Sequence, residues 1–300
     1  MTQVATGMSR SDANDRMVDG EFLFTIGDFR NIAAMLHGDA GISLLESKAT
    51  LVYSRLAKRL RTLGIESFRD YCALVASEEG ADERVRMLAA LTTNVTRFFR
   101  EPHHFEHLKT TVLPPLIQKA KQGGKIRLWS AACSTGQEPY SIAATLLSML
   151  PDAGKYDIKI LATDIDPHVV AEGRRGVYTA AALEPVPSSL RDRWFSPASQ
   201  QDGEKRWAVA DEMRDMVEFR ELNLIGTWPM KGKFQAIFCR NVVIYFNDDT
   251  QATVWKKFMP YLDVGGVLYI GHSERVTGPA ADQLETVGIT TYRLKGGATR

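Results

Sequence analysis

The chain after about Lys125 alternates short apolar runs with segments of helical character, and this alternation limits the possible folds more than any other feature. The apolar runs lie at Lys125–Trp129, Ile158–Thr163, Val217–Arg220, Phe234–Cys239 and Val267–Gly271. The helical stretches between them lie at Glu138–Leu150, Pro167–Arg174 and Thr250–Leu262. Strands that alternate with helices in this way form a parallel sheet covered on both faces. We therefore predict an α/β fold for this region.

The N-terminal part of the chain follows a different pattern. Between Phe22 and about Leu91 it reads as helical, without strand-like runs. Apolar residues recur there at four-residue spacing, which places them on one helical face: Leu45, Ala49, Val52, Leu56 and Leu60. We predict an all-helical domain at 21–91, then at 92–123 a linker and a helix leading into an α/β domain at 124–300. Residues 1–20 lack an apolar core of secretory type, and we predict a disordered tail.

One segment, at about 176–215, interrupts the alternation. It contains three prolines, the polar stretch SPASQQDGEKR and two tryptophans, Trp194 and Trp207. A simple crossover between parallel strands needs far fewer residues. We predict an inserted subdomain, with a small antiparallel sheet as its expected form; a long surface loop without a role is the alternative.

Composition excludes several classes of protein. The hydrophobic fraction of 44% and the charged fraction of 24% are those of an ordinary globular protein. A net charge of +1 argues against a general nucleic-acid binder, and no apolar run approaches the roughly 20 residues of a membrane span. Three widely spaced cysteines, Cys72, Cys133 and Cys239, argue against a disulfide framework. We expect a reducing compartment, the cytoplasm.

The turn after the first apolar run, Ser130–Tyr140, is rich in small residues. Small residues let the backbone approach a ligand, and a helix N-terminus offers free N–H groups. The turn matches neither the dinucleotide nor the nucleoside-triphosphate motif. The second run ends at Asp164 and Asp166, where doubly wound folds grip a ribose diol. Asp166 precedes Pro167 and suits a helix N-cap, so Asp164 is left for the ligand.

Two later segments complete the expected crevice. Phe234–Phe246 reads as a buried strand that ends in polar residues, at the edge where open α/β sheets bind ligands. In Tyr261–Ile270 we interpret the glycine pair as the end of a helix before the next strand.

Four motifs carry a resemblance to a known family. From Gly124 onward the chain resembles the class I S-adenosylmethionine-dependent methyltransferases. The resemblance narrows to the CheR family of chemotaxis receptor methyltransferases in four segments: Thr92–Glu101, Trp129–Tyr140, Cys239–Tyr245 and Gly271–Glu274. It covers nearly everything after Gly20 and implies a Rossmann-like sheet, an N-terminal all-helical domain and a small inserted β-subdomain. Family members often carry Ala at the position of Cys133 and Glu at that of Gln137.

The resemblance implies a function and a set of site residues. Methyl groups would pass from S-adenosyl-L-methionine to receptor glutamates, giving methyl esters for sensory adaptation and S-adenosyl-L-homocysteine as product, without a metal. The segment with Asn94, Thr96 and Arg100 would contact the cofactor from above, and Glu138 would lie near its ammonium. Asp164 would bind the ribose, and Asn223 and Leu224 would border the adenine. Arg240, Asn241 and Tyr245 would line the methyl-transfer end.

Acceptor chemistry agrees with this reading. A glutamate carboxylate, with a free pKa of about 4.3, is ionised at neutral pH and needs no strong base. The sulfonium already activates the methyl group, so alignment is the main task. Arg100 can hold a carboxylate bidentately and Tyr245 can donate one directional hydrogen bond. We expect these two as the catalytic residues, with Arg100 positioning rather than activating the acceptor.

Alternative functions have less support from the residues. His103, His104 and His107 form HHxxH without an HExxH pattern, so we expect no metal site. The stretch after the fourth strand lacks the NPPY turn of adenine-N6 methylation, and no cysteine follows a proline, as cytosine-C5 methylation requires. A non-catalytic module that binds S-adenosylmethionine or a receptor tail remains the alternative. Because Cys133 and Cys239 should end neighbouring strands, we expect alkylation of either to obstruct the site.

The partner is expected to be the cytoplasmic helical bundle of a receptor. Arg55, Lys58 and Arg59 share one helical face, and a basic face suits an acidic bundle; an ordinary solvated face is the alternative. A receptor C-terminal peptide could dock on the inserted subdomain. We expect a monomer that binds no nucleic acid and does not insert into a membrane.

Overall fold

The computed structural model describes residues 15–198 and 203–296. The chain divides into two compact units, Met1–Thr93 and Asn94–Arg300, which are described separately. Among the described residues, no helix is both long and apolar enough to span a membrane.

The first unit is entirely helical. Its helices are α2 (Ile26–Ala40), the 3₁₀ turn η1 (Glu46–Lys48), α3 (Ala49–Leu63), α4 (Phe68–Ala76) and α5 (Ala81–Leu91). Thr25 begins α2 with a capping box that it shares with Asp28, and Gly41 ends this helix in the left-handed conformation. The predicted apolar face of α3 is buried from Ala49 to Leu60, but Leu45 lies before the helix and is 67% exposed.

The predicted N-terminal tail is only partly covered by the described residues, since 1–14 lie outside them. The amide of Met17 donates to the carbonyl of Phe24, and that of Ile26 donates to the carbonyl of Asp15. Residues 15–17 therefore pair with the segment before α2, and the prediction of disorder is wrong for them.

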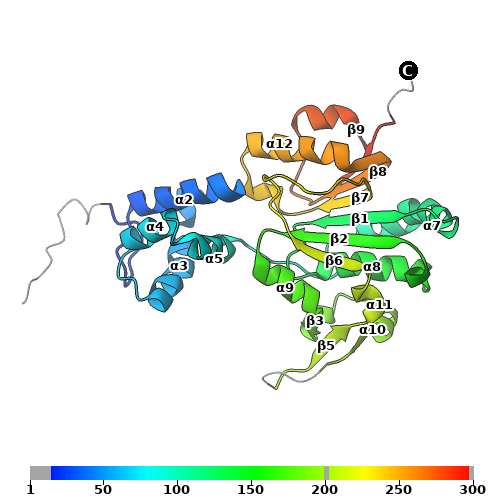
Figure 1. Cartoon of the computed structure of the whole chain (residues 1–300), viewed down its shortest axis with the longest axis horizontal. Helices are drawn as coiled ribbons and strands as arrows, with labels where there is room; N and C mark the ends of the chain where they lie inside the picture. Colours follow the sequence, from blue (N-terminus) through cyan, green and yellow to red (C-terminus); the bar gives the residue numbers. More distant parts are fainter. Residues whose placement is uncertain (1–14, 199–202, 297–300) are drawn as a thin grey trace, which may run out of the picture. The chain divides into compact units, whose positions relative to one another are not determined.

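The second unit is built on a seven-stranded sheet in the order β6-β2-β1-β7-β8-β10-β9, with β6 to β8 lying side by side in Figure 1. The strands from β6 to β8 are parallel, and β10 and β9 are antiparallel additions. The strand bounds are β1 Ile126–Ala131, β2 Ile158–Asp164, β6 Val217–Glu221, β7 Phe234–Cys239, β8 Leu262–Ile270, β9 Leu284–Gly288 and β10 Thr291–Leu294. The order reverses between β1 and β7, which makes this the topological switch point.

Helices accompany the strands as the alternation predicted. Strands β1 and β7 are buried at five of their six positions, as expected for a sheet covered on both faces. Helix α8 packs against β1, β2 and β6, and α9 against β2 and β6. The helix bounds are α6 Pro102–His107, the π turn η2 Leu108–Val112, α7 Leu113–Lys121, α8 Gln137–Met149, α9 Pro167–Arg175 and α12 Asp248–Phe258, with short 3₁₀ turns at Ala153–Lys155, Met259–Tyr261 (η6) and Gly278–Gln283.

The segment between α9 and β6 forms the expected small antiparallel sheet. Its order is β3-β5-β4, and it lies beyond the β6 side of the large sheet in Figure 1. Tyr178, Trp194 and Phe195 from this segment are buried in the core of the unit, so an irregular surface loop is ruled out for its described part. Residues 199–202, within its polar stretch, lie outside the described residues. The bounds are β3 Val177–Thr179, η4 Ala181–Leu183, α10 Ser188–Trp194, β4 Phe195–Pro197, β5 Arg206–Val209 and α11 Asp211–Arg214.

The glycine pair does not end a helix, so that interpretation is wrong. Helix α12 and its 3₁₀ extension η6 end at Tyr261, and the glycines lie inside β8. Gly265 has φ of 74°, and a Cβ on Gly266 would lie 2.8 Å from the carbonyl oxygen of Asp263. The pairing register of β7 with β8 shifts nearby, which identifies an irregularity of bulge type.

Candidate active site

The carboxyl ends of three neighbouring strands converge at the switch point. Ala131 of β1 is paired with Thr163 of β2 on one side and with Cys239 of β7 on the other. Side chains that follow these residues therefore meet at one edge, where open α/β sheets bind ligands. Gly136 ends the turn after β1 with φ of 95°, and a Cβ there would lie 2.9 Å from Cα of Gly173. Only glycine fits this conformation and this approach.

Asp164 ends β2 and organises the turn after β1. Its Oδ2 accepts from the amide of Ser134 at 2.8 Å and its Oδ1 from that of Asp166 at 3.1 Å. Burial raises the pKa of the Asp164 carboxyl, which these amide bonds oppose. Because a carboxylate has about four acceptor positions, acceptor capacity remains after these two bonds.

Asp166 has the structural role expected from its position before Pro167. Its Oδ1 accepts from the amide of His168 at 2.9 Å and caps α9. Its Oδ2 accepts from Nδ2 of Asn94 at 2.8 Å. The N-cap prediction is confirmed, and the capping residue also holds Asn94, one of the implied cofactor residues.

Glu138 and Arg240, both implied cofactor residues, are partners of each other. Nη1 of Arg240 lies 3.0 Å from Oε2 of Glu138, whose Oε1 accepts from the Ser130 hydroxyl at 2.7 Å. The guanidinium also donates to the carbonyl of Arg100 and lies 3.4 Å from Oε2 of Glu101. Burial raises the pKa of Glu138, and the positive charge of Arg240 opposes that rise. This buried pair joins β7, helix α8 and the segment before α6.

The segment Asn94–Glu101 folds onto the turn after β1. The carbonyl of Asn94 accepts from Oγ of Ser134 at 2.8 Å, and the amide of Phe99 donates to Oγ of Ser141 at 2.9 Å. Nη1 of Arg100 donates to the carbonyl of Val95 at 3.0 Å. Thr96 and Arg100 are half-buried on this segment, which thus carries three of the implied residues to the carboxyl ends of the strands.

The other implied residues follow β6 and β7. Oδ1 of Asn223 accepts from the amide of Ile225 at 3.1 Å, and Leu224 is buried. Asn241 has φ of 58°, a left-handed conformation that is uncommon outside glycine. Tyr245 ends the 3₁₀ turn η5 (Val243–Tyr245) and is half-buried.

Glu274 ends the motif Gly271–Glu274, and the sequence alone predicts no role for it. Its buried carboxylate accepts amide bonds from the loop after β7 and from Gly271 at the end of β8. Its place in the motif Gly271–Glu274 was the only sequence signal, because nothing in the local pattern indicates which amides a distant carboxylate will bind.

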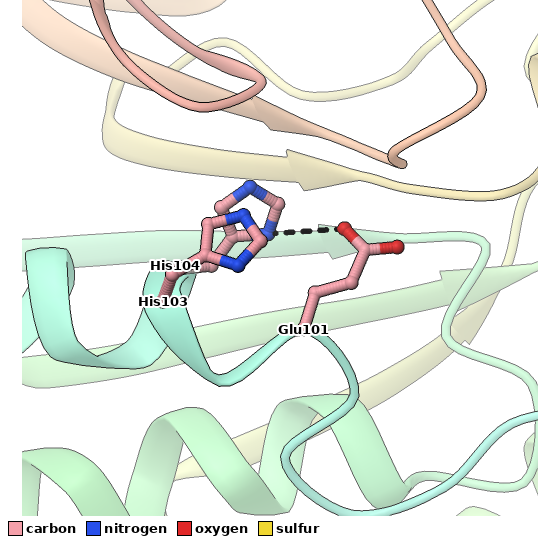
Figure 2. A group of neighbouring side chains, drawn as sticks. All are labelled: Glu101, His103 and His104. Carbon is pink, nitrogen blue, oxygen red and sulfur yellow. Dashed lines mark ion pairs between the residues drawn. The ribbon is translucent and has the colours of Figure 1, made fainter.

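The histidine cluster lies beside the buried arginine. Figure 2 shows the carboxylate of Glu101 directed toward His104, with Nδ1 and Oε2 3.6 Å apart. These two residues and His103 form the described group whose geometry could admit a metal ion. The same Oε2 lies 3.4 Å from Arg240, so a guanidinium already supplies the positive charge, and burial lowers the pKa of His104 to about 3. Nε2 of His104 contacts the carbonyl of Ile289 at 3.2 Å, as a structural histidine would.

Cys133 and Cys239 lie at the ends of neighbouring strands, as predicted, and both are buried. That alkylation of either thiol would obstruct the site stays a prediction. Burial raises the pKa of each thiol well above its ordinary value, and a buried neutral thiol reacts slowly. Alkylation is therefore a poor probe of this site.

Basic residues of α3 have partners within the first unit, and their contact with a receptor stays a prediction. Arg59 makes two hydrogen bonds to Glu83 of α5, at 2.9 and 2.5 Å. Nη1 of Arg55 donates to the carbonyls of Ala90 and Thr92. Two of the three proposed receptor contacts are thus committed to packing within the helical unit, and Lys58 remains exposed.

Comparison with known proteins agrees with this geometry. The CheR methyltransferase SAM-binding domain matches residues 94–293, and the CheR methyltransferase all-alpha domain matches residues 27–92. The chain belongs to the CheR family. A "Probable chemotaxis protein methyltransferase" of Rhizobium etli is 56% identical over 86% of this chain and 96% of its own length. "Chemotaxis protein methyltransferase 2" of Pseudomonas aeruginosa is 42% identical over 91% and 94%, and a Salmonella typhimurium chemotaxis methyltransferase is 38% identical over 89% of each.

Membership of the CheR family establishes the coarse activity. The second unit is an S-adenosylmethionine-dependent methyltransferase domain, and the predicted Rossmann-like fold class with an N-terminal all-helical domain is confirmed. The cofactor fits the residues at the switch point, because Asp164 retains acceptor capacity for hydroxyl groups.

Proposed function

We propose that this CheR-family methyltransferase transfers methyl groups from S-adenosyl-L-methionine to glutamate carboxylates of chemotaxis receptors, forming methyl esters. The observation that carries the proposal is the convergence, at one sheet edge, of Asp164, the Asn94–Glu101 segment and the loop after β7. The names of the relatives, which are chemotaxis methyltransferases, supply the class of partner.

Cofactor binding would use the groups that end the strands. Asp164 would accept from the ribose hydroxyls, with Asn223 and Leu224 bordering the adenine. The Glu138–Arg240 pair and Asn94 would define the end nearer the amino-acid part. The bound cofactor supplies an electrophilic methyl group on a sulfonium; the protein's task is to align an acceptor with it and to exclude water.

Arg100 and Tyr245 would act on the acceptor. Among the described residues Arg100 forms no ion pair, and its one side-chain bond goes to the carbonyl of Val95. Its guanidinium is therefore available to a substrate carboxylate, while Arg240 holds the Arg100 carbonyl in place. A glutamate held by Arg100 and Tyr245 would be ionised and ready for in-line attack.

Transfer of labelled methyl groups to receptor-containing membranes tests the proposal directly. The label should appear on the receptor, be released by mild base as an ester should be, and be suppressed by S-adenosylhomocysteine. Arg100→Ala should lower the rate by about 10- to 100-fold, because a misplaced acceptor loses alignment. Label that withstands base, or that never reaches the receptor, would refute glutamate esterification.

A non-catalytic binding module remains the second candidate. It would bind S-adenosylmethionine in calorimetry while transferring no label in the parallel assay. We favour the enzyme because the carbonyl of Arg100 is held by Arg240 and Tyr245 ends the turn after β7, at the sheet edge where the cofactor is expected. The edge strands β3 and β4 of the inserted sheet are the expected docking place for a receptor C-terminal peptide, by strand addition.

A further inference from the structure

One carboxylate, that of Glu274, binds two loops at the methyl-transfer end of the sheet. Its Oε1 accepts from the amides of Val242 and Val243 at 2.8 and 2.9 Å. Its Oε2 accepts from the amides of Asn241 and Gly271 at 2.9 and 2.6 Å. The first three amides follow β7 and the fourth follows β8, so a single side chain ties together the ends of two neighbouring strands.

Three consecutive amides directed at one anion form a concave nest of the kind that binds phosphate or carboxylate ligands in other proteins. Here the chain's own glutamate fills it. The left-handed residue that opens the nest is Asn241, with φ of 58°, a conformation that the surroundings must maintain. The second loop is equally constrained, because a Cβ on Gly271 would lie 2.4 Å from Nδ2 of Asn241.

The buried carboxylate of Glu274 depends on its four amide hydrogen bonds. Glu274 is 8% exposed and, among the described residues, forms no ion pair. A buried carboxylate without a cation is costly unless its oxygens are hydrogen-bonded. The four amide bonds satisfy both oxygens, and they all depend on the loop after β7 and on Gly271 staying where they are. Glu274 and these loops therefore fix each other.

We propose that Glu274 is a positioning residue for methyl transfer: through the nest it fixes Asn241 and the turn that ends in Tyr245. The inference rests on the proposed function, in which these residues line the methyl-transfer end. Glu274 itself is directed into the backbone and does not touch the reacting atoms, so its effect on the acceptor is indirect.

Glutamine is the informative substitution. It keeps the size of the side chain but offers one acceptor oxygen and an NH₂ group, which would face amide donors. Glu274→Gln should therefore lose the bonds made by one carboxylate oxygen and release part of the nest. Aspartate keeps the charge but is one methylene shorter, so Glu274→Asp should have a milder effect. The matched control is Glu285→Gln, which changes an exposed glutamate of β9 that pairs with Arg293.

The test measures four properties of the full-length variants: S-adenosylhomocysteine affinity, kcat and KM for receptor membranes, thermal unfolding, and hydrogen exchange at Asn241–Val243. For Glu274→Gln we expect kcat to fall by about 100-fold, affinity for S-adenosylhomocysteine to fall by less than about tenfold, and the three amides to exchange faster. Glu285→Gln should match wild type throughout. If Glu274→Gln does not fold, Glu274→Asp takes its place. This variant must then show a larger fall in kcat than in affinity for S-adenosylhomocysteine.

The outcomes separate this inference from the proposed function. Wild-type protein that fails to methylate receptors refutes the function, while the exchange data still test the nest. If the wild type is active and Glu274→Gln folds with an unchanged kcat, the positioning role is overturned. A lowered melting temperature with unaltered kcat would assign Glu274 to stability alone and overturn the role as well.

Discussion

In each of the two units an arginine binds a buried glutamate, and the two clusters differ in how fully their polar atoms are hydrogen-bonded. In the helical unit Arg59 binds both oxygens of Glu83, whose Oε1 also accepts from the hydroxyl of Tyr71 at 3.0 Å. In the methyltransferase unit Arg240 lies between Glu138 and Glu101. The charges are alike, but the surroundings of the second cluster leave polar atoms without partners.

Three unpartnered atoms lie in the Arg240 cluster, while others lie on Trp194, Arg206 and Arg214 of the inserted segment. Nε of Arg240, Oε2 of Glu101 and Nδ1 of His104 are buried without a hydrogen-bond partner among the described residues, whereas no atom of the Arg59 cluster is in this position. Unsatisfied buried polar groups are costly and concentrate at sites with a function. The ion pair between helices therefore serves the fold, whereas the one at the strand ends keeps bonding capacity at the edge where open α/β sheets bind ligands.

The largest expected effect comes from removing each arginine in turn. Arg59→Met should destabilise the helical unit by about 3 kcal/mol, because Glu83 would stay buried with its main partner gone. Arg240→Met should also leave Glu138 buried without its cation, and in addition it should lower methyl transfer by more than about 100-fold, because the carbonyl of Arg100 loses its donor. Denaturant unfolding followed by circular dichroism, and the transfer assay on folded protein, give the two readouts.

The chain offers a probe for each unit. All five tryptophans follow Lys125, so tryptophan fluorescence reports only on the methyltransferase unit. For Arg59→Met the helical signal should change at lower denaturant than the fluorescence does. Lys58→Met, on the exposed side of α3, should change stability by less than about 0.5 kcal/mol. An Arg59→Met variant that keeps its stability but loses activity would reverse the proposed contrast.

Much of the fold was predictable because buried parallel strands read as apolar runs. β1 and β7 are buried at nearly every position, and their runs were found to within a few residues. β9 was missed because an exposed edge strand carries polar side chains, and the bulge in β8 was mistaken for a helix end because glycine has both uses.

The site was predictable only where a residue's role depends on its own strand or turn. The N-cap role of Asp166 could be read from its position before Pro167. The pairing of Arg59 with Glu83 joins two helices, and the bonds of Glu274 join two strand ends. Such long-range partners leave no periodic signal, so the arginine face of α3 was interpreted as a surface.

A second prediction concerns the cofactor crevice. Asp164→Asn should weaken S-adenosylhomocysteine binding by about 1–3 kcal/mol, because an amide accepts more weakly than a carboxylate. Calorimetry measures the affinity, and Asp157→Asn, at an exposed pair with Arg127, is the control. If the affinity is unchanged, Asp164 does not bind the cofactor. The functional contrast between the two units then loses much of its support.

A third prediction uses pH to separate the units. Burial beside Arg240 lowers the pKa of His104 to about 3, against 6.5 when unfolded. The unfolded chain therefore takes up this proton at a higher pH than the folded chain does. The contribution of neutral His104 to the free energy of unfolding is fully present above about pH 6.5 and decreases as the pH falls toward 3. At 1.36 kcal/mol per pH unit, acidification from pH 6.5 to 4.5 should cost the methyltransferase unit about 2 kcal/mol.

Tryptophan-detected unfolding of wild type and His104→Gln should resolve this contribution. Glutamine can still donate to the carbonyl of Ile289 but does not titrate, so its stability should vary less with pH. The low pKa of Glu101 adds to acid sensitivity and the raised pKa of Glu138 opposes it, which is why the difference between the two proteins is the measure. Identical pH dependence would show that His104 is not the titrating group.

The smallest expected effect concerns the exposed side of α3. With Arg55 and Arg59 committed inside the helical unit, Lys58 carries what remains of the proposed receptor contact. Exposed charges contribute about 0.2–1 kcal/mol and are screened by salt. Lys58→Glu should therefore raise KM for receptor membranes about two- to fivefold at low ionic strength, while S-adenosylhomocysteine affinity stays constant.

Lys48→Glu is the matched control, because it makes the same change of charge at another exposed position of the helical unit. If general repulsion between an acidic receptor and a less positive enzyme explained the effect, both variants would raise KM equally. A specific contact requires a larger increase for Lys58→Glu, and the excess should vanish at about 1 M salt, where the Debye length is only about 3 Å. Equal increases, or none, would leave α3 as a helix whose basic residues serve the fold alone.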